Sequence, residues 1–287
     1  MTASSLRLAL PKGRMQASVM QLLHDAGIRV TVDERGYRPQ VSLPGFETKI
    51  LKPQNIVEML HLGSRDVGFA GADWVAELDA DLVELLDTAL DPVQIVVAAP
   101  TALLEAGKLP ARHLVVASEY ARLTAGWIAA SGVDATVVRS YGATEVFPPE
   151  DADVIVDNSA TGSTLRANGL SVVDVVMTSS TRLFASPRAL DDPEKRDRID
   201  HLVLLVRSVL DARQRVMLEV NVGAADLERL CAALPCMRHP TISPLHAENA
   251  YAVKAAVPRK ALPTLIPELK ACGGSDIVVS TLAQIVP

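Results

Sequence analysis

The stretch Asp153–Gly169 constrains the fold of this chain more than any other segment. Residues 154–156 form an apolar run, which predicts a short β-strand, and Asp157 places a carboxylate at the end of that strand. Residues 161–164 then supply hydroxyl groups and an unhindered backbone where the pattern predicts the start of a helix. Amide groups at a helix start have no partner within the helix and attract anions. The segment therefore indicates a loop that binds a phosphate group, with Asp157 placed to hold sugar hydroxyls or a hydrated metal ion.

A simpler interpretation of the same residues is an ordinary capped helix that follows a strand. Thr161 or Ser163 would then be the N-cap, because Ser and Thr hydroxyls commonly accept a hydrogen bond from the first helical turn. The segment alone leaves both interpretations open.

The composition indicates a globular protein with two or three compact parts. The chain has 287 residues, of which 49% are hydrophobic and 22% are charged. Aromatic residues make up only 3% and the formal net charge is −6, which argues against a surface that binds nucleic acid by base stacking or phosphate contacts. Any phosphate ligand must therefore be bound by local donors.

The sequence also bears on location and redox state. No apolar run approaches the roughly 20 residues that span a bilayer, and residues 5–10 are too short for the core of a secretion signal. We therefore expect a cytoplasmic protein without membrane association. The cysteines, which are Cys231, Cys236 and Cys272, lack the spacing of metal ligands and are expected to be buried thiols.

Strands and helices are predicted to alternate along most of the chain, which is typical of an α/β fold with a largely parallel sheet. The pattern begins at residues 6–10 and restarts near Ile95, which favours two α/β units. Residues 193–213 predict a long amphipathic helix. After this helix, elements in the order βαββαβ predict a ferredoxin-like domain; they cover residues 216–220, 224–233, 241–243, 250–257, 259–271 and 276–280.

Two loops after predicted strands carry residues that suit phosphates. Lys12, Gly13 and Arg14 follow the first strand, at the edge where open α/β sheets place ligands. The alternative is a solvated basic turn. Gly71 and Asp73 follow another strand, where Asp73 could contact a ligand or cap the next helix.

Glu145 lies shortly before the Asp157 loop and is expected to face the same crevice, although a lone glutamate on a helix is usually solvated. Together, Glu145 and Asp157 would offer oxygen ligands to Mg2+, which needs few protein ligands when the substrate brings phosphates. The sequence has neither a P-loop nor a GxGxxG motif, which disfavours nucleotide kinases and dinucleotide enzymes. The serines near Asp157 have no evident histidine partner, which disfavours nucleophilic acyl transfer.

Four motifs together resemble the ATP phosphoribosyltransferase family over nearly the whole chain: Leu10–Arg14, Asp66–Asp73, Gly142–Glu145 and Asp157–Gly169. In the tail, Met217–Asn221 and His239–Leu245 resemble the regulatory domain of the long form of that enzyme. The resemblance implies that N1 of ATP displaces pyrophosphate from phosphoribosyl pyrophosphate, with Mg2+ required, in the first step of histidine biosynthesis.

The resemblance also implies a fold. It is a two-lobed core like that of periplasmic solute-binding proteins, followed by a ferredoxin-like (ACT-like) regulatory domain. Lobe I would contain residues 1–94 and 185–213, lobe II residues 95–184 with the phosphoribosyl pyrophosphate loop, and the regulatory domain residues 214–287.

The resemblance assigns site residues as well. The catalytic set would be Lys12, Arg14, Glu145 and Asp157, with Asp157 as a ligand of Mg2+, directly or through water. The substrate-binding set would be Gly13, Gly71, Asp73, Ser159, Ala160, Thr161, Gly162, Ser163, Thr164 and Leu165. Such sparse charges suit the reaction, because pyrophosphate departure needs positioning and charge neutralisation more than a strong base.

Regulation is implied too. Histidine would inhibit the enzyme by binding near Asn221, Met237, Thr241 and Ala256, and the chain would assemble into a dimer or hexamer. Some relatives carry an acid at the position of Asn221; a neutral amide pairs less strongly with the histidine amine, which puts feedback sensitivity in question. Residues 158–161 also differ from the valine-containing loop of many members.

Two other functions fit parts of the pattern. A noncatalytic bilobal sensor would bind small ligands without turnover, and a different phosphoribosyltransferase would turn over only with another base.

Overall fold

The computed structural model describes residues 5–32, 36–246 and 248–287. The chain divides into two compact units: residues up to Gln21 with Arg29–Asp200, and Leu22–Ile28 with residues from His201 onward. Helices α1 (Arg14–Asp25) and α7 (Pro193–Arg213) each contribute residues to both units.

The described strands of the first unit form an eight-stranded sheet in the order β4-β1-β5-β10-β6-β9-β7-β8. Their bounds are β1 (Leu6–Pro11), β4 (Phe46–Leu51), β5 (Val67–Gly71), β6 (Val83–Pro100), β7 (Leu114–Ser118), β8 (Ala135–Arg139), β9 (Val154–Ser159) and β10 (Leu170–Ala185). The short strands β2 (Val30–Thr31) and β3 (Gln40–Val41) pair with each other.

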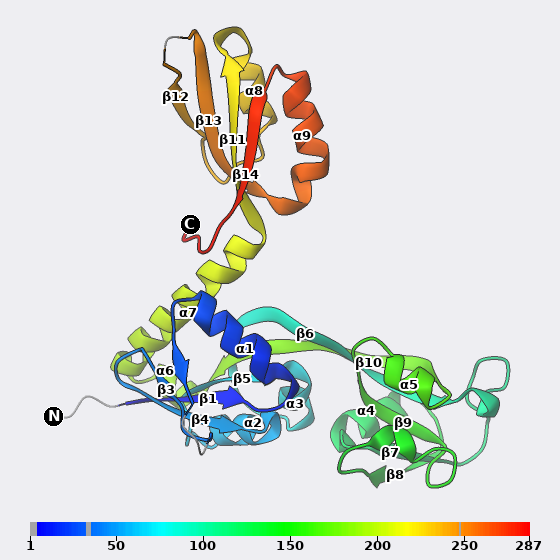
Figure 1. The fold of residues 1–287 in the computed structure, drawn as a ribbon. Helices are drawn as coiled ribbons and strands as arrows, with labels where there is room; N and C mark the ends of the chain where they lie inside the picture. Colours follow the sequence, from blue (N-terminus) through cyan, green and yellow to red (C-terminus); the bar gives the residue numbers. More distant parts are fainter. Residues whose placement is uncertain (1–4, 33–35, 247) are drawn as a thin grey trace. The chain divides into compact units, whose positions relative to one another are not determined.

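The expectation of a largely parallel sheet is wrong for its centre. Strands β4, β1 and β5 are parallel at one end, and β9, β7 and β8 are parallel at the other. Between them, β10 pairs antiparallel with β5 and β6, and β6 pairs antiparallel with β9. The reason is that β6 and β10 are long strands that run side by side between the two groups of elements (Figure 1).

Apolar side chains pack at both ends of this sheet. Helix α2 (Pro53–His61) packs on β1 and β5 through Ile56, Val57 and Leu60, next to α3 (Ala72–Glu77). At the other end, α4 (Ala121–Ser131) covers β6, β7 and β9, and α5 (Ser163–Ala167) packs on the opposite face. The remaining helical turns are η1 (Thr101–Leu103), η2 (Thr144–Val146) and α6 (Pro187–Leu190).

The expected lobe boundaries at residues 94 and 184 fall within β6 and β10, and the division into lobes stays a prediction.

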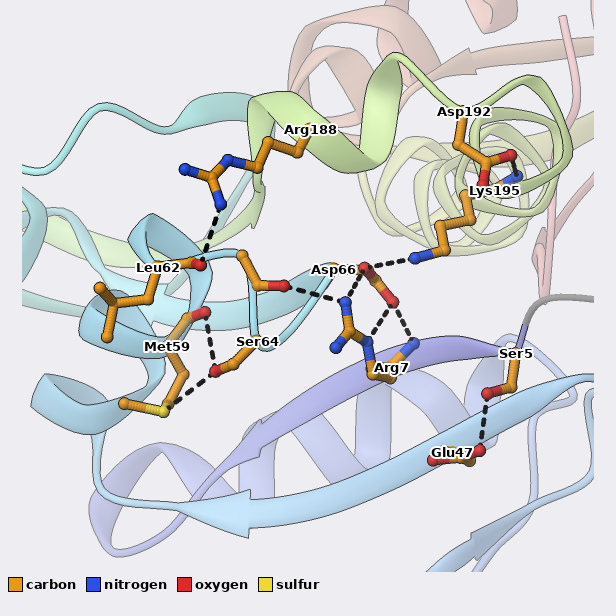
Figure 2. A network of polar contacts seen from close by, with 11 residues as sticks. Ser5, Arg7, Glu47, Met59, Leu62, Ser64, Asp66, Arg188, Asp192 and Lys195 are labelled. Atoms are coloured by element: carbon orange, nitrogen blue, oxygen red, sulfur yellow. Dashed lines mark hydrogen bonds and ion pairs between the residues drawn. The ribbon is translucent and has the colours of Figure 1, made fainter.

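A buried charge network fixes the start of β5 (Figure 2). Asp66 is 2% exposed. Its carboxylate accepts hydrogen bonds from the Arg7 backbone amide at 2.7 Å and guanidinium at 2.9 and 3.0 Å, and from Lys195 Nζ at 2.9 Å. Burial alone would raise the pKa of Asp66, but these donors outweigh burial and lower it. The network therefore joins β1, β5 and the first turn of α7.

The second unit contains the predicted ferredoxin-like domain, and the α/β fold class with this separate domain is confirmed. Its elements are β11 (Arg215–Gly223), η3 (Ala224–Asp226), α8 (Leu227–Ala233), β12 (Thr241–Pro244), β13 (Ala250–Pro258), η4 (Arg259–Ala261), α9 (Leu262–Ala271) and β14 (Ser275–Thr281). The sheet order is β12-β13-β11-β14, with antiparallel pairs throughout.

The core of this domain lies between the sheet and its two helices. Every second residue of β11, from Val216 to Val222, is buried and packs in one cluster with Leu230 of α8 and Leu269 of α9. The cysteines lie at the margin of this core as free thiols and are only half-buried, so the expectation of buried thiols is met in part. Elsewhere in the same unit, Arg213 forms a 2.9 Å ion pair with Asp25.

Across the described part of the chain, no helix is long and apolar enough to cross a membrane.

Candidate active site

The loop after β9 surrounds a hollow of about 310 Å³, here called the loop hollow. Val154, Ile155 and Val156 are fully buried, so the strand fixes where the loop begins. The hollow is lined by Arg14, Glu145, Asp157, Asn158, Ser159, Ala160, Thr161, Gly162, Ser163, Thr164 and Leu165. The structure therefore gathers the whole predicted phosphate loop, both predicted acids and one predicted cation around one space.

The helix that follows this loop differs from the expectation. Helix α5 has only five residues, and Gly162, at φ +70°, takes the N-cap position. Neither Thr161 nor Ser163 occupies the N-cap position, so the N-cap roles suggested for them are wrong. The Thr161 hydroxyl still accepts a long hydrogen bond, of 3.4 Å, from the Ser163 amide at the start of α5. The hydroxyls of the two residues also bond to each other at 3.0 Å. Because so short a helix has a small dipole, the loop's own amides and hydroxyls must bind any anion.

Asp157 lies half-buried within β9, which continues to Ser159, and two acids act on its charge. Its Oδ1 accepts hydrogen bonds from the Asn158 backbone amide at 2.6 Å and from Asn158 Nδ2 at 3.1 Å. Burial, and then the charges of Glu145 and Glu119, raise the pKa of Asp157 to about 6. A cation at this point would relieve the accumulated negative charge.

A second hollow of about 370 Å³, here called the main hollow, shares Arg14 with the loop hollow. Lys12 also lines it, with Nζ 3.3 Å from the Tyr37 hydroxyl and 5.0 Å from the centre of that ring. Gly13 turns the chain between β1 and α1 at φ +84°, a conformation that favours glycine. The turn leaves both cations exposed, so their charges are available to a ligand.

Asp73 lines the main hollow but does not cap α3, since Gly71 occupies that N-cap position. Asp73 is 5% exposed, and its carboxylate accepts hydrogen bonds from Ser179 Oγ at 2.7 Å and from the Tyr120 hydroxyl at 2.8 Å. Gly71 leaves room for this carboxylate, because an added Cβ would lie 2.1 Å from Asp73 Oδ1. The capping interpretation is therefore wrong, and a substrate contact of Asp73 stays a prediction.

Sequence reasoning missed several residues that border the two hollows. The main hollow is also lined by Trp74, Asp91, Glu119, Tyr120, Asn158 and Ser179. Arg166 is near the loop, because a Cβ added to Gly162 would lie 2.9 Å from its Nη1. Asn158 and Arg166 lie within the Asp157–Gly169 motif, which could have drawn attention to them. No local pattern marks the others as site residues; only the folded sheet brings them together.

Comparison with known proteins identifies the family. A family model described as ATP phosphoribosyltransferase matches residues 52–208, and one described as the HisG C-terminal domain matches residues 212–284. The chain is 38% identical over 279 residues to the ATP phosphoribosyltransferase of Chlorobium phaeobacteroides, covering 95% of this chain and 94% of the relative. Its identity to the ATP phosphoribosyltransferase of Pelotomaculum thermopropionicum is 37% over 289 residues, with 98% and 99% covered. The chain belongs to the ATP phosphoribosyltransferase family.

A solved structure supports the fold of this family member. The model is similar to a chain of the ATP phosphoribosyl transferase (HisG:HisZ) complex from Thermotoga maritima, with a TM-score of 0.64 and 23% identity. The match covers 72% of this chain and 98% of that chain. The chain is a pentosyl-transferring enzyme, as its family membership shows. The family model of the HisG C-terminal domain matches residues in the second unit, which agrees with the predicted long form.

Members of the ATP phosphoribosyltransferase family generally use a metal ion. Among the described residues, no group of three or more His, Cys, Asp or Glu side chains could hold one by itself. Asp157, with Glu145 and Glu119 acting on it, offers the negative potential that such an ion needs. The site fits a hard cation whose remaining ligands are water and substrate phosphates.

The residues predicted to bind a regulatory ligand lie in the C-terminal domain of this family member. Asn221 pairs with Ala252, Thr241 with Lys254, and Ala256 with Met217 across neighbouring strands. Asn221, Thr241 and Ala256 therefore share the sheet face opposite the helices, because directly paired residues point to the same side. Met237 lies in the loop before β12, and Asn221 Nδ2 donates a 3.1 Å hydrogen bond to Asp276, an acid that sequence reasoning missed.

Proposed function

We propose that the two hollows joined at Arg14 bind the substrates of phosphoribosyl transfer to ATP. The supporting observation is that a single cation borders both a phosphate-type loop and a larger polar hollow. The loop hollow would take the 5-phosphate and ribose of phosphoribosyl pyrophosphate, and the main hollow the pyrophosphate and ATP.

In the loop hollow, the backbone amides and hydroxyls from Ser159 to Leu165 would bind the phosphate group, which needs donors on several sides. Asp157 would accept hydrogen bonds from the ribose hydroxyls. Glu145 would add a second acid to the same wall of the hollow.

The chemistry breaks the bond between C1 of the ribose and the pyrophosphate oxygen, and forms a bond from C1 to N1 of adenine. The ribose becomes cation-like as the pyrophosphate leaves with the bonding electrons. Lys12 and Arg14 neutralise the departing charge, and Asp157 stabilises the positive sugar, so alignment and electrostatics supply the acceleration. The N1 lone pair is the nucleophile and needs no protein base.

Mg2+ is the proposed metal ion, and when bound it would shield the pyrophosphate charge. Asp157 would hold it, directly or through water. The proposal further includes inhibition by histidine, bound at Asn221, Met237, Thr241 and Ala256, and assembly into a homo-oligomer from dimer to hexamer. It also includes the division into lobe I (residues 1–94 and 185–213), lobe II (residues 95–184) and a regulatory domain (residues 214–287).

The test mixes purified protein with ATP, phosphoribosyl pyrophosphate and Mg2+ and follows ultraviolet absorbance. We expect new absorbance from the N1-substituted adenine, which disappears when either substrate is omitted. Binding of both substrates without turnover would favour a noncatalytic sensor, and turnover with another base alone would favour a different phosphoribosyltransferase.

A further inference from the structure

We propose that Tyr120 is a positioning residue for phosphoribosyl transfer, acting through Asn158 to hold the carboxylate of Asp157. Tyr120 lies between β7 and α4 and carries no sequence motif. The inference rests on the proposed function, since it assigns a role within that reaction.

The polar contacts form a continuous chain from Asp73 to Asp157. The Tyr120 hydroxyl donates a 2.8 Å hydrogen bond to Asp73 Oδ2 and accepts one of 3.2 Å from Asn158 Nδ2. The same Nδ2 and the Asn158 backbone amide donate to Asp157 Oδ1 at 3.1 and 2.6 Å. Burial, and then the neighbouring Asp73, raise the pKa of Tyr120, so the hydroxyl keeps its proton and remains the donor to Asp73.

Tyr120 is itself held rigidly. It is 1% exposed, and its ring stacks on Trp74 with 4.7 Å between ring centres. Its backbone amide donates to Ser118 Oγ at 2.9 Å, and that hydroxyl donates to the Val156 carbonyl at 2.6 Å. Val156 directly precedes Asp157, so Tyr120 is tied both to β9 and to the buried Asp73.

This chain of bonds spans the two ends of the sheet. Asp73 is on α3, directly after β5, and β5 pairs with β1, whose end carries Lys12 and Arg14. Asn158 is on β9, in the parallel group at the other end. Tyr120 therefore links the strands that position the cations to the strand that positions Asp157, and the reaction needs both at fixed separation.

The test is a double-mutant cycle on the full chain, with kcat and KM measured for wild type, Tyr120→Phe, Asn158→Ala and the double variant. Phenylalanine keeps the stack on Trp74 and removes only the hydroxyl. Each single change is expected to lower kcat by about 10-fold or more, with KM for either substrate within about threefold. Because both changes break the same chain, the double variant is expected to be no slower than the slower single variant. Tyr251→Phe is the matched control, since Tyr251 is half-buried in the other unit and its hydroxyl has no hydrogen-bond partner among the described residues.

Several outcomes would overturn the proposal. Wild-type kcat in Tyr120→Phe, or losses that multiply in the double variant, would show that Tyr120 does not act through Asn158. If circular dichroism shows that Tyr120→Phe does not fold, Asn158→Ala decides alone, and an unchanged kcat in that variant would refute the role. Absence of turnover in the wild type would refute the proposed function as well, whereas normal wild-type turnover with unaffected variants would refute only this inference.

Discussion

The ammonium group of Lys195 lies 2.9 Å from the carboxylate of Asp66, although 129 positions separate the two residues in the sequence. Arg7 bonds to the same carboxylate, so one buried acid meets two cations. This relationship attaches the first turn of α7 to the sheet of the first unit.

Asp66→Asn should therefore lower the free energy of unfolding at pH 7 by about 3 kcal/mol, because it leaves two cations without their buried partner. The folded-state pKa of Asp66 is lowered below its ordinary value of 3.8, so its stabilisation is present above that pH and is lost as the pH falls through the folded-state pKa. Urea unfolding at pH 7 and near pH 3 checks this. Asp79→Asn removes an exposed pair with Arg122 and should cost less than about 1 kcal/mol. Equal losses in the two variants would contradict the expectation.

Asp157→Asn should reduce turnover by about 100-fold or more, because the carboxylate is proposed to orient and stabilise the sugar. The same change should stabilise the fold. The pKa of Asp157 is raised from 3.8 to about 6, so the folded state disfavours its charged form, at most by about 3 kcal/mol. The stability gain should be full above about pH 6 and vanish below about pH 4. Thermal unfolding in EDTA across this range checks the sign, and a destabilised variant at pH 7.5 would refute it.

Arg14→Ala should raise KM for both substrates and lower kcat, since Arg14 borders both hollows. Loss of charge-assisted hydrogen bonds predicts a fall in kcat/KM of about 100-fold. Steady-state kinetics with each substrate varied in turn measures this. Arg207→Ala, an exposed change on α7, is the control. A KM effect confined to one substrate would mean that the two substrates do not meet at Arg14.

Gly71→Ala should destabilise the first unit by about 1–3 kcal/mol, because its Cβ would overlap the Asp73 carboxylate at 2.1 Å. The backbone at Gly71 has an ordinary negative φ, so the effect is steric. Gly126→Ala, in α4, is the matched control: its Cβ would meet open space among the described residues and should stabilise the helix by about 0.5–1 kcal/mol. Chemical denaturation measures the free energy of unfolding of both variants. Equal values for Gly71→Ala and Gly126→Ala would contradict the steric explanation.

Local sequence patterns were sufficient to predict those helices and strands whose own apolar periodicity stabilises them. The bounds of α7 and the order of the ferredoxin-like elements are of this kind. The start of β9 at Val154 is another, but its predicted end at Asp157 is wrong, because pairing with β6 continues β9 to Ser159. Residues 83–94 of β6 have no alternating apolar pattern, and they form a strand because β10 pairs with them, so the sequence did not predict it.

The site shows the same division. The segment from Asp157 to Leu165, which runs from the end of β9 into α5, could be predicted as a site because its residues are neighbours in the sequence. The bonds from Asp73 to Tyr120 and Ser179 join positions 47 and 106 residues apart, and no spacing in the sequence marks them. A glycine such as Gly71 indicates that another group lies close to the backbone, but the sequence does not show which side chain that is.

The two helices that contribute to both units have a thermodynamic consequence. In α7, the buried Ile199 belongs to the first unit, and the buried Leu202 and Val206 belong to the second. In α1, Val19 and Leu22 divide in the same way. If either unit melts, the part of each helix that belongs to it loses its packing, so neither unit can unfold without weakening helices that its neighbour shares. A small molecule that binds one unit should therefore raise the melting temperature of both units.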